Sequence, residues 1–339
     1  MQKRIDSSGR SGCAHVVWIV VIALLAGCET TTQFSAPGVD IVARSGDFLL
    51  VDTPADTSYS TLTQQLGLSD ANTLESLNGK HSNTRQLTLV PRKPLNATGF
   101  FSDGYRIVPI LCYHQFTNGP AKQQLEVSAA DFRAQLQYLR DNNFTVLSMA
   151  QVEAILNDKL PMPERAVVLT IDDGYRSVYD VAFPIIQEFN YPFTLYVYTD
   201  FVGGGAAMTW QQLTEVQRSG LIDVQSHTKT HTSLSRLSTD ETNSQYLARI
   251  QTELAASREV LQKKLGHSVW QISYPYGNSS DQVTKLLKDN GYRVGLTVTR
   301  GFNTPYTEPA LLHRTMIYNH HTLKDFSDLV SVYNRKRLK

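Results

Sequence analysis

AVVLTIDDGYRSVYD, residues 166–180, is the stretch that decides the fold: a run of mostly apolar, β-branched residues ends in two adjacent carboxylates, Asp172 and Asp173, and a glycine. The run predicts a buried strand that passes into a loop at the carboxylates. Because side chains alternate between the faces of a strand, consecutive carboxylates can take different tasks, one on a metal ion and one moving protons. Asp and Gly are also ordinary turn formers, so a plain turn is the alternative for this segment alone.

A second segment, LIDVQSHTKTHTSL, carries two histidines four residues apart. The strand-like LIDVQ delivers His227 to another strand end, and in a tight turn His231 can face the same point. Imidazole nitrogen and carboxylate oxygen suit a divalent ion such as Zn²⁺, and two histidines with one aspartate leave positions open for water and substrate. A surface or capping role is the alternative for the pair alone; together with the carboxylates, the pair favours a metal site.

Two further strand ends carry candidate functional groups. VWQISYPYGNSS, residues 269–280, is a β-rich run that ends in a loop. Pro275 fixes one backbone dihedral of this loop and Gly277 permits an unusual one, so that a backbone N–H can be held in position to donate to an oxyanion. RIVPILCYHQF, residues 106–116, ends an apolar run in His114. Taken alone, the first segment is typical of an aromatic turn and the second of a core histidine.

In this order and spacing, TIDDG, SHTKTH and YPYG resemble the first three motifs of the polysaccharide deacetylase family, carbohydrate esterase family four. VPILCYH resembles the start of the circularly permuted branch that deacetylates poly-N-acetylglucosamine. The resemblance covers roughly residues 105–329. It implies a metal-dependent hydrolase that removes N-acetyl groups from N-acetylglucosamine residues of a cell-envelope or extracellular polysaccharide. A peptidoglycan deacetylase and a catalytically inactive glycan-binding lipoprotein are the main alternatives.

The resemblance also implies a role for each matching residue. Asp172 is expected to be the general base and His114 the general acid. The expected metal ligands are Asp173, His227 and His231, and the expected oxyanion donor is the backbone N–H of Tyr276, which follows Pro275. The expected cofactor is one divalent ion, Zn²⁺ first, with Ni²⁺, Co²⁺ or Fe²⁺ as alternatives.

One departure from the family pattern concerns the partner of Asp172. Many members carry an arginine before the Pro-Tyr pair that orients the base, but Ser273 and a tyrosine stand there in this chain. Arg314, in the strand-like ALLHRTMI, is the candidate replacement by its position. Its neighbour His313 matches the acid of the unpermuted branch. We favour His114 as the acid, because a strand that turns Arg314 toward the site turns His313 away.

Strand-like and helical segments alternate beyond residue 105, which predicts an α/β fold with a parallel sheet. Functional groups clustered at strand ends favour a barrel over an open sheet, and the resemblance implies a distorted (β/α) barrel. Ser238 and Glu241 form a capping-box pattern that predicts the start of a long helix ending at Leu265.

The region before the barrel predicts a small α+β module. SYSTLTQQLGL and DANTLESLNG are typical of two short amphipathic helices, and RQLTLVP is typical of a closing strand. This pattern resembles a LysM module, which binds N-acetylglucosamine polymers. A small structural cap is the alternative.

The N-terminus has the features of a targeting signal. Basic residues precede the apolar run AHVVWIVVIALLAG, which is too short for a comfortable membrane span and ends at Cys28. LAGC resembles a bacterial lipobox, which implies cleavage before Cys28 and lipidation of its thiol; an uncleaved signal anchor is the alternative. The lipobox thus implies a lipid-anchored protein of the cell envelope. Glu29 and not aspartate follows the cysteine, which in a Gram-negative cell resembles retention at the outer membrane, facing the periplasm. The expected organisation is a lipoprotein signal peptide (1–27), a tether (28–43), a LysM-like module (44–91), a linker (92–104) and a polysaccharide deacetylase domain (105–339).

The composition is that of a globular protein, with 41% hydrophobic and 19% charged residues. A formal net charge of +1 indicates no nucleic-acid partner. Of the three cysteines, only Cys112 is left for the folded domains once Cys13 is removed and Cys28 is lipidated, so no disulfide is expected. The expected partners are an N-acetylglucosamine polysaccharide and, through the lipid, a membrane.

Overall fold

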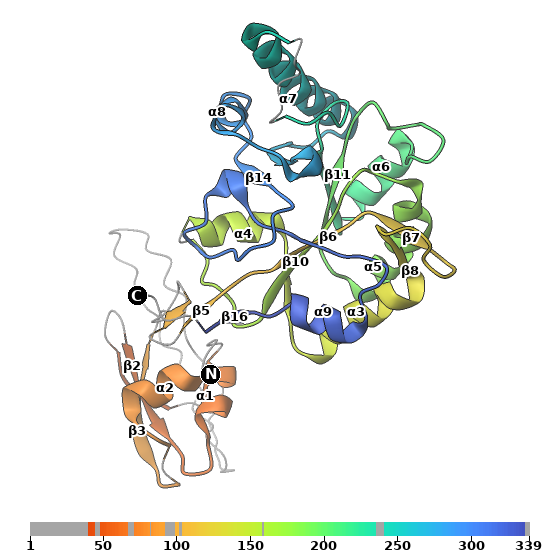
Figure 1. Ribbon diagram of the computed structural model, residues 1–339. Coiled ribbons are helices and arrows are strands. Elements are labelled where there is room, and N and C mark those ends of the chain that lie inside the picture. Colours follow the sequence, from red (N-terminus) through yellow and green to blue (C-terminus); the bar gives the residue numbers. More distant parts are fainter. Residues whose placement is uncertain are drawn as a thin grey trace, which may run out of the picture.

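The computed structural model describes residues 40–44, 48–66, 71–81, 83–91, 99–101, 104–157, 159–234 and 241–335 (Figure 1). The expected signal peptide, Cys28 and the tether up to residue 39 lie outside the described residues. Among those that are described, no helix combines the length and the apolar content that a membrane span requires.

The N-terminal unit is a three-stranded antiparallel sheet with two short helices and a core of its own. The predicted helices and closing strand are confirmed, as α1 (Tyr59–Gln65), α2 (Ala71–Asn78) and β3 (Gln86–Pro91). The expected boundary at residue 44 is wrong: β1 (Asp40–Arg44) takes in the end of the expected tether. It pairs with β2 (Phe48–Thr53), with Ile41 packed against the core.

The central sheet consists of parallel strands that curl into a distorted barrel, which confirms the expected fold class. Its order is β14-β13-β12-β11-β10-β6-β15, and β9 adds to β10 outside this path. A parallel bridge between Leu296 and Leu312 joins β14 to the segment that leads into β15. The strands are β6 (Ile110–Tyr113), β9 (Thr145–Leu147), β10 (Ala166–Ile171), β11 (Phe193–Val197), β12 (Ile222–Ser226), β13 (Gln271–Ser273), β14 (Val294–Leu296) and β15 (Thr315–Met316).

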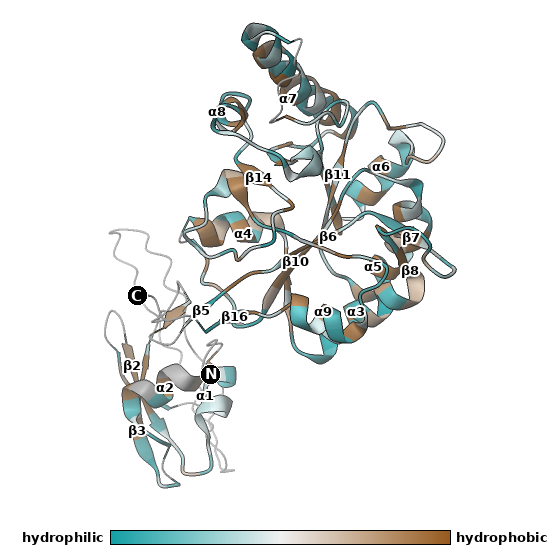
Figure 2. Ribbon diagram, in the orientation of Figure 1, coloured by the Kyte–Doolittle hydropathy of each residue, from teal (hydrophilic) through white to brown (hydrophobic). Residues whose placement is uncertain are grey.

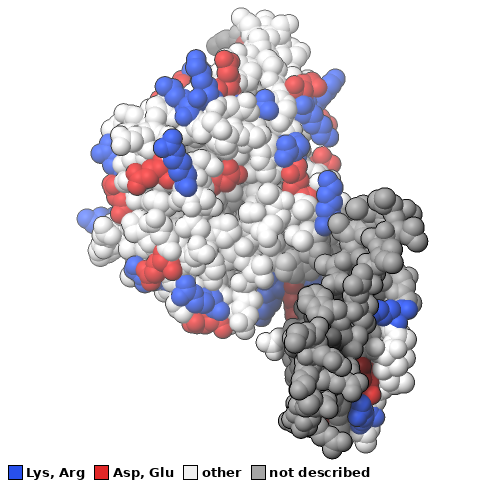
Figure 3. Space-filling model, turned by 180° about the vertical axis from the view of Figure 1, so that it is seen from behind, with Lys and Arg blue, Asp and Glu red and all other residues white. Residues whose placement is uncertain are grey.

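Helices surround the sheet and turn their polar residues outward (Figure 2). A π-helical turn at Val178–Ala182 leads into α5, whose second residue is Pro184, and this accommodates the proline expected inside the helix. The helices are α3 (Ala129–Asp141), α4 (Met149–Leu156), α5 (Phe183–Phe189), α6 (Trp210–Arg218), α7 (Asn243–Leu265), α8 (Asp281–Asp289) and α9 (Leu323–Leu329). On the face drawn in Figure 3, cationic and anionic side chains are interspersed.

Alternation along the buried strand β10 divides its side chains between two cores. Val167, Leu169 and Ile171 belong to the large outer core, which includes residues of the surrounding helices, whereas Ala166 and Val168 belong to a smaller second cluster. Asp172 follows in the series of Ala166 and Val168, so its carboxylate points to the inside of the barrel. The strand thereby delivers one carboxylate to the mouth of the barrel without breaking the outer core.

The expected linker is shorter than residues 92–104. Within the described residues, β4 (Phe100–Phe101) and β5 (Gly104–Arg106) form antiparallel pairs, and β16 (Tyr333–Asn334) extends this sheet. Aromatic packing supplies the reason: Phe100 lies 5.5 Å from Tyr105 and 5.4 Å from Tyr306, ring centroid to ring centroid.

The predicted start of the long helix α7 is also wrong. The capping box is formed by Thr242 and Gln245, and Glu241 instead pairs with Arg249 at 2.8 Å. Ser238 lies outside the described residues. Two consecutive Ser/Thr-x-x-Glu/Gln patterns compete at this point, and the ion pair to the first helical turns favours the later one.

Candidate active site

Functional side chains meet at the carboxyl-terminal mouth of the barrel, because each follows or lies beside a strand of the same parallel sheet. Asp172 follows β10, His227 follows β12, and His114 follows β6. Tyr276 lies in the short 3₁₀ turn Pro275–Gly277 after β13, and Arg314 directly precedes β15.

Unusual backbone geometry concentrates at this mouth. Asp173, Thr228, His231 and Tyr276 have positive φ angles of 76°, 72°, 64° and 60°. Non-glycine residues adopt this region uncommonly, and it is retained where the surrounding structure holds it in place, often at functional sites. The other two such residues in the described chain are asparagines, which tolerate this conformation.

Gly174, the last residue of the TIDDG motif, permits the turn that presents the two carboxylates. Its φ is +84°, and a Cβ at this position would lie 2.7 Å from Val197 Cγ1 on β11. Both the backbone conformation and the close approach therefore require glycine. The motif combines a strand end, two acids and the only residue type that fits the turn.

Asp173, His227 and His231 form a compact set of donor atoms. Asp173 Oδ1 lies 3.5 Å from His227 Nε2 and 3.4 Å from His231 Nε2. Two ligands that each lie about 2.0–2.1 Å from a tetrahedral Zn²⁺ are about 3.4 Å apart. The spacing of the three side chains therefore fits one divalent ion.

The tautomer of His227 supports this fit. Its Nδ1 lies 2.7 Å from the backbone carbonyl of Ser273, a contact that places the proton on Nδ1 and leaves a lone pair on Nε2. That lone pair faces the carboxylate of Asp173, and two acceptors at this separation need a cation between them. Burial lowers the pKa of His227, but the neighbouring Asp172 and Asp173 outweigh it and raise the pKa, so these carboxylates favour positive charge at this position.

The loop that carries His231 is held from outside by Glu253 on α7, a residue that sequence reasoning missed. Its buried carboxylate accepts hydrogen bonds from the N–H groups of Lys229 and Thr230, at 2.9 and 2.8 Å, and from the hydroxyl of Thr230 at 2.7 Å. Three bonds to one carboxylate fix the strained turn between the two histidines.

Arg314 lies against Asp172 inside the barrel. The two terminal nitrogens of its guanidinium donate to the two carboxylate oxygens at 2.8 and 2.7 Å, and both side chains are almost fully buried. This bidentate contact comes from β15, the strand end at which the sequence proposed a replacement for the missing arginine. Burial alone would raise the pKa of Asp172, but the charges of Arg314 and His227 hold it well below its usual range.

Ser273 joins the metal-ligand set to the Asp172–Arg314 pair. Its hydroxyl donates to Asp172 Oδ2 at 2.9 Å and accepts from Arg314 at 2.7 Å, while its carbonyl orients His227. The Arg314 guanidinium also donates to the Thr297 carbonyl at 2.8 Å. Ser273 stands at the position where the family pattern has arginine. This substitution was the feature of the sequence from which a role for Ser273 beside Asp172 could have been predicted.

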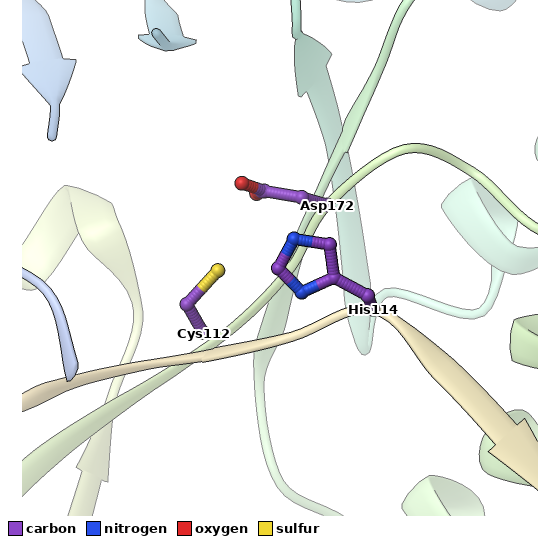
Figure 4. A group of neighbouring side chains, drawn as sticks. All are labelled: Cys112, His114 and Asp172. Atoms are coloured by element: carbon purple, nitrogen blue, oxygen red, sulfur yellow. The ribbon is translucent and has the colours of Figure 1, made fainter. Parts of the chain in front are cut away.

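His114 lies close to Asp172 and to the buried thiol of Cys112 (Figure 4). The His114 side chain is 8% exposed, and its Nδ1 has no hydrogen-bond partner within the described chain. Burial lowers the pKa of His114, against the charges of Asp172 and Asp173, which raise it. The acid form of this imidazole is therefore lost at a lower pH than that of an ordinary histidine.

Cys112, His114 and Asp172 also bring three potential ligand atoms close together. Two facts oppose a metal ion at this group. Both oxygens of Asp172 are already bound by Arg314, and burial raises the pKa of the Cys112 thiol well above its usual range, so that the thiol stays protonated. Of the two groups, the one at Asp173 is therefore the better candidate for a metal site.

Two aromatic rings flank the exposed side of His231. Tyr198 and Tyr276 lie 5.0 and 4.8 Å from its imidazole, ring centroid to ring centroid, and Tyr276 is 63% exposed. The N–H groups of Gly277 and Asn278 bond back to Tyr274 and Pro275, which fixes the turn around the Tyr276 backbone.

His313 does not join these residues. Its backbone N–H donates to the Asn303 side chain at 2.9 Å, and its Nδ1 lies 3.2 Å from the Thr299 carbonyl. Since Arg314 points into the barrel, its neighbour points away, as the alternation along the strand requires.

Removing the two imidazoles should abolish metal binding. We expect about one equivalent of divalent metal in the wild-type protein. The metal affinity of His227→Ala/His231→Ala should fall by more than the roughly 10–100-fold that is typical when a residue hydrogen-bonded to a metal ligand is removed. Elemental analysis of both proteins measures this, with His313→Ala as the matched control. A full equivalent of metal in the double variant would show that Asp173, His227 and His231 are not the metal ligands.

The comparisons with known proteins agree with this geometry. Residues 159–295 match the family model described as polysaccharide deacetylase. The chain is 28% identical over 261 residues to the poly-beta-1,6-N-acetyl-D-glucosamine N-deacetylase of Escherichia coli, a match that covers 67% of this chain and 39% of the relative. It thus spans less than half the length of that relative.

Two solved structures share the fold. The Streptococcus pyogenes deacetylase PplD in complex with acetate matches with a TM-score of 0.59 and 27% identity, over 66% of this chain and 98% of its own. IcaB from Ammonifex degensii matches with a TM-score of 0.58 and 26% identity, over 66% of this chain and 96% of its own. The chain therefore contains a polysaccharide deacetylase domain of carbohydrate esterase family four.

Proposed function

We propose that this protein hydrolyses the N-acetyl groups of N-acetylglucosamine residues in a polysaccharide of the poly-β-1,6-N-acetylglucosamine type. The observation that carries the proposal is the pair of adjacent carboxylates, with Asp172 held by Arg314 and Asp173 facing two histidines. The named activities of relatives from Escherichia coli and Staphylococcus epidermidis support this choice of polymer.

The side chains at the mouth divide the proton transfers between them. The bidentate contact with Arg314 keeps Asp172 ionised and oriented, ready to accept a proton from the attacking water. The Tyr276 N–H donates to the oxyanion that develops on the acetyl oxygen, and His114 delivers a proton to the departing amine. Asp173, His227 and His231 would hold a divalent ion, for which we propose Zn²⁺ ahead of Ni²⁺, Co²⁺ or Fe²⁺, and such an ion would supply Lewis-acid polarisation and make water easier to deprotonate.

Release of acetate from defined polymers tests the proposal. Full-length protein in detergent is assayed on poly-β-1,6-N-acetylglucosamine and on peptidoglycan, each with Zn²⁺, Ni²⁺, Co²⁺ or Fe²⁺. We expect acetate from the first polymer with at least one ion. Release from peptidoglycan alone would establish the alternative substrate, and release from neither would identify an inactive glycan-binding protein.

The second substrate is tested for a specific reason. The N-terminal unit has the strand–helix–helix–strand order of β2, α1, α2 and β3, with the two strands paired antiparallel. This order supports the proposal that residues 40–91 are a LysM-like, glycan-binding module. Such a module would suit a polymer of the cell wall as well as an exopolysaccharide.

The pH dependence of the rate should separate His114 from His313. Because a general acid must be protonated, the rate falls as the pH rises through its pKa, and burial moves this fall to a lower pH than for an ordinary histidine. His114→Ala should lower kcat/KM by about 10²–10⁴-fold and flatten the alkaline limb, with metal content retained. His313→Ala should leave the profile unchanged. The opposite result would transfer the acid role to His313.

We also propose that lipid on Cys28 anchors the protein in the cell envelope, at the outer membrane facing the periplasm. The sequence LAGC supports this proposal. Cys28→Ser should leave an unprocessed precursor, seen by mass spectrometry of membrane fractions. A variant that matures to the wild-type mass and location would exclude lipid attachment at Cys28.

A further inference from the structure

Three rings gather in the turn that follows β15, outside the set of residues considered so far. Tyr318 and His320 stack with centroids 5.5 Å apart and planes 9° apart. His321 lies edge-on, with its centroid 5.3 Å from Tyr318 and 4.7 Å from His320. We call Tyr318, His320 and His321 the ring cluster.

The pairing of β15 with β6 places this cluster beside the general acid. Met316 pairs with Cys112 in parallel register, and the Ile317 N–H donates to the Cys112 carbonyl at 2.9 Å. His114 lies two residues beyond Cys112, and Tyr318 lies two residues beyond Met316. The two side chains therefore leave neighbouring strand ends at the same level.

Alternation turns the tyrosine toward the mouth of the barrel. Ile317 is fully buried in the outer core, so the residues on either side of it face the other way, the side that Arg314 occupies. The Asn319 N–H donates to the Gln124 carbonyl at 3.0 Å, which ties the turn to the loop before β8 (Glu126–Ser128). The cluster is thus a fixed part of the rim.

The polar atoms of the cluster suit a hydroxyl-rich ligand. The Tyr318 N–H donates to His321 Nδ1 at 3.2 Å, so the neutral imidazole carries its proton on Nε2. Burial, and the charges of His320 and Arg300, lower the pKa of His321 and favour this neutral form, against Asp325, which raises it. Within the described chain, neither histidine belongs to a group of three close metal-ligating side chains, so a metal site is the weaker interpretation.

We propose that the ring cluster is a subsite for a pyranose ring of the polymer next to the residue being deacetylated, an inference that rests on the proposed function. An aromatic face packs against the C–H groups of a sugar ring, and imidazole N–H groups donate to its hydroxyls. In the strand order, β10 with Asp172 lies between β13, which leads to Tyr276, and β15. β6 with His114 lies between β10 and β15, so a polymer chain that crosses the mouth from Tyr276 over Asp172 passes His114 and then reaches the ring cluster.

Chain-length dependence tests the subsite. Acetate release is measured on the monosaccharide and the pentasaccharide of β-1,6-linked N-acetylglucosamine. Tyr318→Ala should raise KM for the pentasaccharide, and this increase should be about ten times the change in KM for the monosaccharide. Tyr318→Phe keeps the ring and should have a KM for the pentasaccharide close to that of the wild type. Tyr306→Ala, which removes an exposed ring packed against β4 instead, is the matched control.

A binding measurement separates this inference from the proposed function. In an Asp172→Asn background, calorimetry with the pentasaccharide should show about tenfold weaker binding when Tyr318→Ala is added. Acetate release without any length-dependent effect of Tyr318→Ala would overturn the subsite and leave the proposed function intact. Equal losses on both substrates, or in Tyr318→Ala and Tyr306→Ala alike, would also overturn it. If wild-type protein releases no acetate, the proposed function fails, and the calorimetry still decides whether the cluster binds the glycan.

Discussion

Asp172→Asn should lower kcat for deacetylation by about 10²–10⁴-fold while the metal content stays at the wild-type level. The amide keeps the size of the carboxylate but cannot accept a proton from water. Metal content should persist because the closest donor set is Asp173, His227 and His231, whereas Asp172 Oδ2 lies 3.9 Å from His227 Nε2. Steady-state acetate release and elemental analysis of the same preparation measure both quantities.

Asp173→Asn is the matched control, because the same chemical change is made one residue along the chain. This variant should lose the metal, since it replaces the carboxylate oxygen that lies 3.4 and 3.5 Å from the two imidazoles. Near-normal turnover in Asp172→Asn would place the base elsewhere. Equal loss of metal from both variants would show that the two carboxylates act together as ligands.

Strand ends were the most predictable part of the site. A strand such as β10 is visible in the sequence because it is buried on both faces, so that apolar residues, interrupted only by Thr170, run up to Asp172. The same signal located His114, His227 and the loop at Tyr276. Parallel pairing then brings all strand ends to one edge, which is why local patterns predicted a site assembled from distant segments.

Contacts between segments were much harder to predict. Glu253 binds the loop of His231 from the middle of α7, where its position in the sequence resembles that of any surface glutamate. Ser273 serves Asp172 through its hydroxyl and His227 through its carbonyl, and a backbone acceptor leaves no trace in residue type. The start of α7 was misplaced because two capping patterns follow each other directly in the sequence, and the ion pair between Glu241 and Arg249 favours the second.

Arg314→Met should lower the free energy of unfolding by about 3–5 kcal/mol, the usual cost of leaving one member of a buried ion pair without its partner. The guanidinium is fully buried, and methionine fills a similar volume without charge. Asp172 then remains buried, with the Ser273 hydroxyl still donating to it at 2.9 Å, and Thr170 loses the guanidinium as its donor. Chemical denaturation at neutral pH measures the loss, and kcat should fall as well, because the base is no longer oriented.

The pH dependence of this loss follows from the sign of the pKa shift. In the wild-type protein the pKa of Asp172 is held below its unfolded value, so its contribution to stability is present above the ordinary aspartate pKa and is lost as the pH falls through the folded pKa. Without Arg314, less positive charge opposes the effect of burial, so the pKa of Asp172 rises relative to the wild type and protonation at low pH relieves the buried charge. The difference in stability between the two proteins should therefore be largest at neutral pH and should narrow on acidification.

A double-mutant cycle shows whether the charge of Asp172 is the cause. Adding Arg314→Met to Asp172→Asn should cost clearly less than adding it to the wild type, because the amide leaves no buried carboxylate to compensate. An equal cost in both backgrounds would mean that Arg314 stabilises the barrel through its other contacts, such as the carbonyl of Thr297, and not through Asp172. Asp172 and Arg314 are far apart in the sequence, and the sheet brings them together because β10 and β15 lie on either side of β6. A smaller cost in the Asp172→Asn background would therefore also show that the arrangement of the strands, and not the local sequence, sets the protonation state of the base.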